Sequence, residues 1–409
     1  MLLRIILLDT LIMILFVYIK KGNFMCEIKE ILDSVEEFNS FKLKYILKKC
    51  CYNVVVFGTG QLGKNIIEIL RQDNINIICA CDNDPNKWGA TWEKTEILEP
   101  KKAVSLYGES ALFIISIFDL FIWDLYEKKN ILAPKNYLEK LGCKNVIYYS
   151  SLYWEYGRDK FTKGSPSDWI LSPSEIKLEY SEILKSYNLF EEESKDLFLN
   201  ILKSRLYHEN GWSVQYCSEL PHFDTLISEN ISEEEVFIDC GAFNGDTLEM
   251  FLKKTKNKFE KYFAIEPIEE NVSAMQNNIK LLNDDIKNKI NILQYAVGNK
   301  NEVLKFKNSG KSSRLTDEVD FTFVKSVKLD DLLSAEKPTW IKMDIEGAEL
   351  NAIKGAAKAI KKYKPKLTIC VYHRSSDLWK IPLEIKKICD DYKFYLRRVS
   401  GDIICYAII

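Results

Sequence analysis

A short stretch near the middle of the sequence joins an acidic residue to two glycines in a way that could bind a cofactor. The apolar run Val236–Ile238 leads into Asp239 and a turn with Gly241 and Gly245, and helix-spaced apolar residues follow over 248–252. Glycines let the backbone approach a ligand closely, and the start of a helix offers free N–H groups. The spacing differs from that of a dinucleotide-binding loop, and an acidic strand end suits a cofactor with a positive charge and no pyrophosphate, such as S-adenosylmethionine. The alternative is a tight turn after a buried strand.

Later apolar runs also end in polar residues. These runs are Tyr262–Glu266, Trp340–Asp344 and Leu367–His373, and Asn291–Gly298 is expected to form a further strand and its exit loop. Glu266 follows the glycine turn by about 20 residues, where a carboxylate can accept hydrogen bonds from ribose hydroxyls. Because the carboxyl ends of parallel strands meet at one edge of a sheet, we expect the polar residues to line one crevice.

Seven stretches, taken in chain order, resemble the FkbM family of S-adenosylmethionine-dependent methyltransferases. They are DCGAFNGDT, AIEPIEENV, QYAVGN, SGKSSRLTD, VKLDDLL, IKMDIEGAE and VYHRSSDLWKIP. The resemblance covers roughly residues 231–409, and DCGAFNGDT together with IKMDIEGAE makes it specific. It implies a class I methyltransferase fold with a terminal antiparallel hairpin (Phe394–Val399 and Ile403–Ile409) and O-methylation, commonly of a sugar or glycan hydroxyl.

From this placement we assign two groups of site residues. The predicted cofactor contacts are Asp239, Gly241, Asn244, Gly245, Glu266 and Pro267. The predicted catalytic residues are Asp344 and His373, because removal of the acceptor proton benefits from a general base and an imidazole with an unperturbed pKa of about 6.5 suits neutral pH. Glu349 is interpreted as an acid at the start of a helix, where the helix dipole favours it. No histidine stands at ligand spacing from Asp344 and Glu346, so we expect no metal.

A second glycine-rich stretch lies near the N-terminus. The apolar run Val54–Phe57 leads into Gly58, Gly60 and Gly63, and the next apolar run ends at Asp82. This is G-x-G-x-x-G between a strand and a helix, with an acid at a suitable distance, and it predicts a Rossmann-like domain that binds a nucleotide sugar or NAD(P). The alternative is a structural domain that keeps its glycines for packing. Between Asp82 and residue 150 the sequence has no Tyr-x-x-x-Lys pair, which disfavours oxidoreductase chemistry in this domain.

Composition and charge exclude some classes of function. The chain has 409 residues with 57 Lys and Arg against 59 Asp and Glu, which gives a net charge of −2 and no indication of a nucleic-acid partner. Eleven cysteines without a C-x-x-C spacing indicate a reducing compartment and buried thiols.

We divide the chain into an apolar segment (1–24), a Rossmann-like domain (25–150), a helical linker (151–230) and a methyltransferase domain (231–409). The stretch Leu2–Ile19 is strongly apolar but contains Arg4 and Asp9, and Lys20 and Lys21 follow it. It is barely long enough to span a bilayer. One interpretation is an anchor to the inner face of the membrane; the other is a mis-set translation start, with Met25 as the true one. In both cases we expect a cytoplasmic protein.

The sequence therefore predicts an α/β fold with two Rossmann-like, doubly wound sheets. It predicts an S-adenosylmethionine-dependent O-methyltransferase that acts on a small-molecule or glycan acceptor in polysaccharide biosynthesis. Two alternatives stay open: an oxidoreductase or epimerase that works through the N-terminal domain, and a nucleotide-binding scaffold without catalysis. The acceptor and the oligomeric state are not determined by the sequence.

Overall fold

The computed structural model describes residues 43, 45–117, 134–152, 156, 171, 173–207, 217–218, 223–228, 231–307, 314–315, 321–399 and 402–409. They form two compact units: the first holds the described residues up to 180 and residues 203–207, and the second holds 181–202 and the described residues from 217 onward. The predicted apolar segment and most of the motif SGKSSRLTD lie outside the described residues. Within the described part of the chain, no helix combines the length and apolar character needed to cross a membrane.

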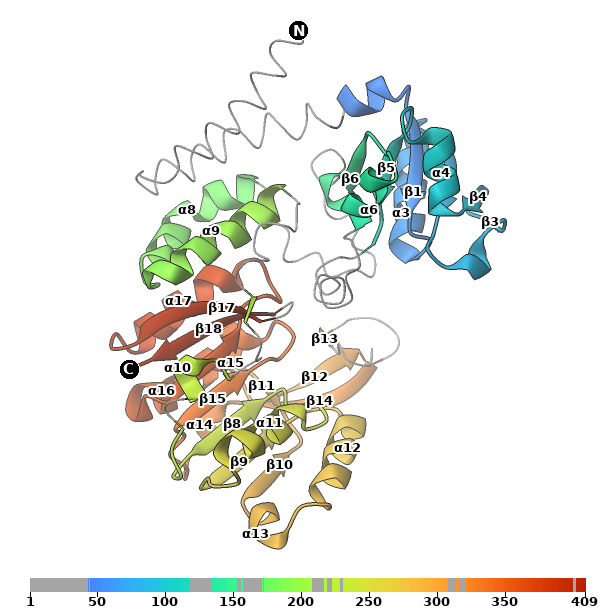
Figure 1. Ribbon diagram of the computed structural model, residues 1–409. Coiled ribbons are helices and arrows are strands. Elements are labelled where there is room, and N and C mark those ends of the chain that lie inside the picture. The colour runs from blue at the N-terminus through green and yellow to red at the C-terminus, as the bar shows by residue number, and fades with distance from the viewer. Residues whose placement is uncertain are drawn as a thin grey trace. The chain divides into compact units, whose positions relative to one another are not determined.

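The first unit is built on a mainly parallel sheet (Figure 1). Its elements are β1 (Asn53–Phe57), α3 (Gln61–Gln72), β2 (Asn76–Cys81), η2 (Pro85–Lys87), β3 (Thr91–Trp92), β4 (Thr95–Leu98), α4 (Pro100–Tyr107), β5 (Leu112–Ile115), α6 (Pro134–Lys140), β6 (Val146–Tyr148) and η3 (Tyr149–Leu152). The strand order is β3-β4-β2-β1-β5-β6, and β3 is antiparallel to β4. The order changes direction between β1 and β5, so the glycines after β1 lie at this switch point.

The second unit contains an eight-stranded sheet. The chain between the sheets forms α8 (Pro173–Tyr187) and α9 (Glu192–Tyr207). The later elements are β7 (Cys217–Ser218), α10 (Thr225–Ser228), β8 (Val236–Cys240), α11 (Asp246–Thr255), β9 (Lys261–Ile265), α12 (Glu269–Ile279), α13 (Asp284–Lys287), β10 (Ile290–Leu293), β11 (Ala296–Val297), β12 (Glu302–Lys307), β13 (Arg314–Leu315), β14 (Phe321–Val327), α14 (Leu329–Leu332), β15 (Trp340–Met343), α15 (Glu349–Gly355), α16 (Ala357–Tyr363), β16 (Lys366–Cys370), α17 (Asp377–Ile388), β17 (Lys393–Val399) and β18 (Asp402–Ile408).

The strand order of this larger sheet is β10-β9-β8-β15-β16-β18-β17-β7. The five strands from β10 to β16 are parallel, and β18 is antiparallel to both of its neighbours. The predicted α/β class and the terminal antiparallel hairpin are therefore confirmed. The chain passes from β8 to β9 and β10 on one side and returns to β15 on the other, so the switch point lies between β8 and β15.

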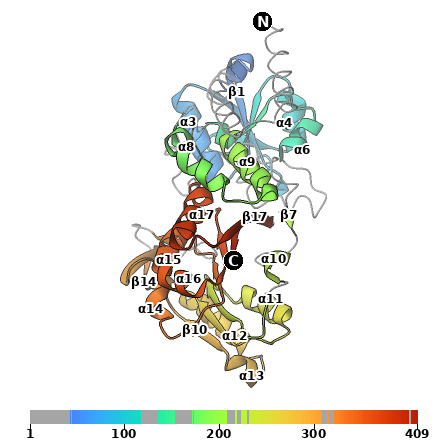
Figure 2. The same cartoon turned by 90° about the vertical axis from the view of Figure 1, so that its left-hand side faces the viewer.

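Large aromatic side chains form the core against which β8 and β15 pack. Trp340 is fully buried, with its ring centroid 4.5 Å from that of Phe237 and 5.3 Å from that of Phe223. Phe251 of α11 stacks on Phe237 at 5.0 Å. Figure 2 shows α10 and α11 on one side of the sheet and α15, α16 and α17 on the other. Burying rings of this size contributes much of the stability of such a core.

A small second sheet, of order β11-β14-β12-β13, corrects one strand prediction. We expected Asn291–Gly298 to form one strand and its exit loop. The strand is present as β10, and a tight turn follows it, in which the backbone N–H of Tyr295 donates to the carbonyl of Leu293 at 3.0 Å. The chain then leaves the large sheet, and β11 pairs in parallel with β14.

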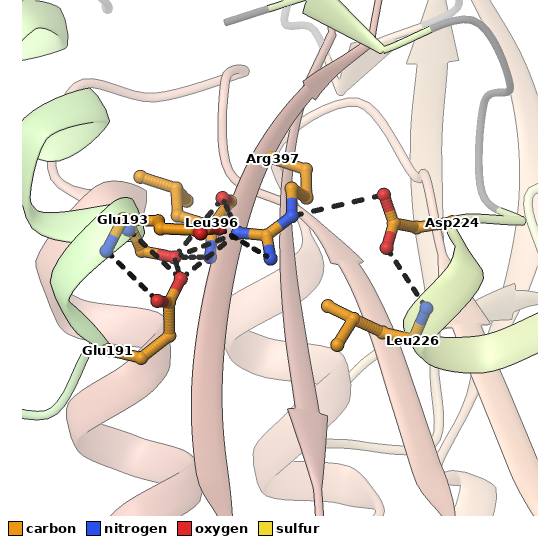
Figure 3. A network of polar contacts seen from close by, with 7 residues as sticks. Glu191, Glu193, Asp224, Leu226, Leu396 and Arg397 are labelled. Carbon is orange, nitrogen blue, oxygen red and sulfur yellow. Dashed lines mark hydrogen bonds and ion pairs between the residues drawn. The ribbon is translucent and has the colours of Figure 1, made fainter.

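Strand β17 pairs with the short strand β7 only at Arg398 and Val399, and it also contacts the residues that lead into α9, as Figure 3 shows. The N–H of Leu396 donates to Ser194 Oγ at 2.7 Å, which satisfies a backbone group that the sheet leaves free. The carboxylate of Glu191 accepts hydrogen bonds from the N–H groups of Glu193 and Ser194 at 2.9 and 3.0 Å and so caps α9. Arg397 Nη1 donates to Glu191 Oε1 at 3.1 Å. One guanidinium thus fixes the capping carboxylate over the sheet edge.

Replacing Arg397 with Met should lower the free energy of unfolding by about 1–2 kcal/mol at pH 7, because a charged hydrogen bond to a half-buried carboxylate is lost. Burial alone would raise the pKa of Glu191, but the hydrogen bonds from Ser194 and Arg397 lower it below its usual value of 4.5. A carboxyl with a lowered pKa stabilises the fold above its unfolded pKa, and this contribution disappears as the pH falls through the folded pKa. The difference in free energy of unfolding between the variant and the unchanged protein should therefore shrink in acid.

Urea unfolding at several pH values measures this difference. The control is Lys253→Ala, because Lys253 forms an exposed ion pair with Glu249. A difference that stays constant down to pH 3 would contradict this account of the cap.

Candidate active site

The loop of residues 241–245, directly after β8, brings two strand ends into contact. Gly241 has a φ of +79°, and a Cβ built on it would lie 1.9 Å from the carbonyl oxygen of Asp344. The N–H groups of Gly241 and Ala242 both donate to the carbonyl of Ile265, at 2.9 and 3.2 Å. Gly245 has a φ of +89° and precedes α11. The loop is thus fixed to β9 and β15, and only glycine fits at position 241.

Glu266 joins this loop to the turn after β9. Its side chain is buried, and Oε2 accepts a hydrogen bond from the N–H of Phe243 at 3.1 Å. Oε1 accepts from the N–H of Ile268 at 3.1 Å and from Asn271 Nδ2 at 3.0 Å. Burial raises the pKa of Glu266, although these hydrogen bonds oppose the shift. Because Oε2 accepts one of the two hydrogen bonds that a carboxylate oxygen can take, it has capacity for one more, such as one from a hydroxyl.

Asp239 was predicted to contact a positively charged cofactor directly, but in the structure its carboxylate binds groups of the protein. Its carboxylate is fully buried between β8 and β15, and Oδ1 accepts a hydrogen bond from Lys342 Nζ at 2.9 Å. Oδ2 accepts one from the hydroxyl of Tyr262 at 2.5 Å. Lys342 also donates to the carbonyl of Gly241 at 3.1 Å. Burial by itself would lower the pKa of Lys342, but the charge of Asp239 raises it. Both charges are therefore neutralised inside the sheet, and Asp239 acts on the glycine loop through Lys342.

The other two predicted cofactor residues, Asn244 and Pro267, lie in the loop after β8 and in the turn after β9. The carbonyl of Asn244 accepts a hydrogen bond from Asn278 Nδ2 at 3.3 Å. Pro267 lines a cavity of about 350 Å³, together with residues 268–270, 294–295 and 322–325. The cavity thus begins at the residue that follows Glu266.

One imidazole and three carboxylates lie close together where β15 and β16 end. His373 Nδ1 lies 2.9 Å from Glu349 Oε1, and His373 Nε2 lies 3.5 Å from Asp344 Oδ1 and 3.7 Å from Glu346 Oε2. The side chains of His373 and Glu349 are 3% and 0% exposed, and those of Asp344 and Glu346 are 25% and 28% exposed. Glu349 Oε1 also accepts a hydrogen bond from the N–H of Ile345 at 2.8 Å. The two predicted catalytic residues therefore lie together, and Glu349, interpreted from sequence as a helix-start acid, is part of the same group.

The surroundings of His373 differ from the expectation of an unperturbed imidazole. Burial alone would lower the pKa of His373, but the carboxylates of Glu349, Asp344 and Glu346 outweigh it and raise this pKa to about 9. The pKa is raised because three carboxylates surround one ring. They come from other parts of the chain, so the position of His373 in the sequence does not reveal them.

Further polar groups that sequence reasoning missed surround this cluster. The hydroxyl of Tyr372 donates to Asp344 Oδ1 at 3.1 Å. Burial, together with the charge of Asp344, raises the pKa of Asp402 to about 7, and burial with the charge of Glu349 raises that of Asp377 to about 7 as well. Asp402 begins the last strand, so only the antiparallel return of β18 beside β16 places it here. The cluster is thus rich in acidic groups.

The glycines of the first unit serve the packing of their own turn. Gly58 has a φ of +108°, and a Cβ on Gly63 would lie 2.4 Å from the carbonyl oxygen of Gly58. A Cβ on Gly60 would have no heavy atom within 4 Å, so this position is open. The turn has the predicted geometry between a strand and a helix, which both interpretations of the domain share.

Asp82, expected to bind a ribose in the first unit, holds groups of the protein itself. Its Oδ2 accepts hydrogen bonds from the N–H and the hydroxyl of Thr59, at 3.0 and 2.5 Å, and from Lys87 Nζ at 2.9 Å. Oδ1 accepts one from the N–H of Asp84 at 3.0 Å. The carboxylate therefore closes the glycine turn onto the end of β2. Nucleotide binding by Gly58, Gly60, Gly63 and Asp82 remains a prediction.

Comparison with known proteins gives matches for both units. Residues 239–396 match the family described as methyltransferase FkbM domain, and residues 50–116 match the family described as C2185-like, N-terminal. The crystal structure of the methyltransferase FkbM from Methylobacillus flagellatus KT has a similar fold, with a TM-score of 0.71 over 93% of this chain and 98% of that chain at 21% identity. A putative rRNA-methylase from Clostridium thermocellum is similar over 45% of this chain and 92% of that chain, with a TM-score of 0.31 and 10% identity. No sequence among curated proteins matches the chain.

Replacing Gly241 with Ala should destabilise the second unit by about 3 kcal/mol or more, because the new methyl group meets the carbonyl of Asp344 and the backbone is held at a positive φ. Thermal or urea unfolding followed by tryptophan fluorescence measures this loss, since Trp340 lies in that core. Gly60→Ala is the matched control, because its methyl group enters open space. Equal stability of the two variants would show that the strand ends are not as close as described.

Proposed function

The second unit contains a methyltransferase FkbM domain, and from this premise we propose that the protein transfers the methyl group of S-adenosylmethionine to a hydroxyl of a carbohydrate. The observation that carries the proposal is the position of Glu266. It is joined to the glycine loop through Phe243 and lies beside the cavity lined by Pro267. The glycine loop follows β8, which borders the switch point of the sheet, where α/β folds bind their ligands, and Glu266 follows the neighbouring strand β9.

In the proposed complex, each part of the donor has a place along this crevice. Glu266 Oε2 accepts a hydrogen bond from a ribose hydroxyl, and the adenine enters the cavity of about 350 Å³ beyond it. The loop 241–245 lies against the amino-acid part of the donor, where glycines leave room for close approach. The sulfonium then points along the strand ends toward β15 and β16, where the acidic cluster lies.

The reaction is an in-line displacement at the methyl carbon. The acceptor oxygen forms a bond to this carbon as the carbon–sulfur bond breaks, and the electron pair of that bond stays on sulfur, which becomes a neutral thioether. The hydroxyl proton passes to a carboxylate. Asp344 and Glu346 are placed for this step because they are the two partly exposed carboxylates of the cluster. The protein contributes alignment and a proton acceptor, which is most of what this reaction needs.

The excess of negative charge in the cluster favours an acceptor that carries no negative charge near its reacting hydroxyl. Asp344, Glu346 and Glu349 surround a single imidazole, so an acceptor with phosphate or carboxylate groups near the reacting hydroxyl would be repelled. Sugar hydroxyls can donate hydrogen bonds to these carboxylates instead. The resemblance of the motifs to the FkbM family points to the same class of acceptor.

Calorimetric titration of the full chain with S-adenosylhomocysteine, the product of the donor, tests the proposal. We expect one site, and we expect Glu266→Gln to weaken binding by about tenfold or more, because an amide cannot accept all three hydrogen bonds and the ribose bond as a carboxylate does. Glu233→Gln, at an exposed pair with Lys258, is the control and should bind as the unchanged protein does.

A parallel titration with NAD separates this proposal from its rival. Binding of NAD without binding of S-adenosylhomocysteine, by protein shown to be folded, would contradict the proposal and move the ligand site to the first unit. Unchanged affinity of the Glu266→Gln variant would remove Glu266 as the ribose partner.

A further inference from the structure

Two buried polar side chains in the acidic cluster have atoms that no hydrogen bond satisfies. Both ring nitrogens of His373 and Oε2 of Glu349 lack a hydrogen-bond partner, although both side chains are almost completely buried. The 2.9 Å contact between His373 Nδ1 and Glu349 Oε1 is an ion pair. Buried polar atoms are nearly always paired, so three unpaired atoms in one place require an explanation. We propose that Asp344, Glu349 and His373 bind a divalent metal ion.

The geometry of the three side chains suits a shared ion. One ligand atom from each lies within 4.8 Å of the others. Ligand atoms at about 2.0–2.2 Å from an ion are at most about 4.4 Å apart, so the group needs to contract by only a few tenths of an ångström. The side chains come from adjacent parallel strands, β15 and β16, and from the first residue of α15. The hydrogen bond from the N–H of Ile345 holds Glu349 in place, as supporting bonds do for metal-binding carboxylates.

The types of ligand indicate which ions fit. One imidazole nitrogen and two carboxylates form a mixed set that suits Mn²⁺, Fe²⁺ or Zn²⁺ better than Ca²⁺, which prefers oxygen ligands. An ion with two positive charges would balance the two carboxylates and satisfy the free oxygen of Glu349 and one nitrogen of His373. Three protein ligands leave positions open, as in metal sites that also bind a substrate.

The position of the site suggests what the ion does, and this part rests on the proposed function. A hydroxyl that binds to a cation loses its proton more readily, because the cation stabilises the alkoxide. Glu346 lies 3.7 Å from His373 Nε2 and is not needed as a ligand, so it stays available as the proton acceptor. The ion would thus hold the acceptor oxygen at the strand ends, next to the donor site.

Titration of metal-depleted full-length protein with Mn²⁺, followed by the electron paramagnetic resonance signal of free Mn²⁺, tests the proposal without any assay of activity. We expect one site per chain. Glu349→Gln should weaken Mn²⁺ binding by at least tenfold, because the amide keeps the hydrogen bond to Ile345 but loses the charge, and His373→Ala should abolish binding. Glu336→Gln, a carboxylate paired with Lys261, is the matched control and should leave binding unchanged.

The outcomes separate the metal site from the proposed function. Absence of Mn²⁺ binding, or binding that Glu349→Gln and His373→Ala leave unchanged, would overturn the site. Thermal unfolding followed by tryptophan fluorescence shows whether each variant is folded, since Trp340 lies in the core of the second unit, and titration with S-adenosylhomocysteine tests the donor separately. Specific Mn²⁺ binding without S-adenosylhomocysteine binding would keep the metal site and refute the proposed methyl donor.

Discussion

A buried ion pair between Asp239 and Lys342 determines the geometry on which the candidate site depends. The two residues are direct partners in the pairing of β8 with β15, at the switch point of the sheet, and they are 0% and 2% exposed. Removing one partner of such a pair leaves an uncompensated charge and typically costs about 3–5 kcal/mol. Because Lys342 also donates to the carbonyl of Gly241, the pair positions the glycine loop as well as the strands.

The order of the strands places different groups on the two sides of this ion pair. On the β8 and β9 side, the loop 241–245 and Glu266 form a rigid, hydrogen-bonded frame beside a cavity. On the β15 and β16 side, Asp344 and His373 stand at the ends of neighbouring strands, and Glu349 at the start of α15 closes the group. The proposed donor site lies on the first side, and the acidic cluster with its imidazole lies on the second side.

Much of this arrangement could be predicted from the sequence, because it depends on local patterns. Apolar runs that end in Asp239, Glu266 and Asp344 predict strands and the edge at which they meet. The contacts between strands were not predictable in this way. His373 is distant from Asp344 in the sequence, and only the pairing of β15 with β16 places it beside the acids. The expectation of no metal relied on ligand spacing along the chain, and that spacing does not show that His373 lies near Asp344 and Glu349.

The role of individual acids was the least predictable part. Asp239 and Asp82 both end strands beside glycine turns, as ligand-binding acids do, but each accepts hydrogen bonds from the protein itself. Whether a carboxylate at a strand end faces a ligand or a lysine depends on side chains from other strands and loops, such as Lys342 and Lys87. A single sequence does not show those partners.

Photochemical cross-linking tests the central claim, that the methyl donor binds at the switch point of the second unit, most directly. Full-length protein is irradiated with S-adenosylmethionine that carries a radioactive methyl group, and the labelled peptides are identified by mass spectrometry. The account predicts label in peptides that contain residues 239–245 or 266–270, and competition by unlabelled S-adenosylhomocysteine. Label confined to peptides from residues 53–98 of the first unit would contradict it.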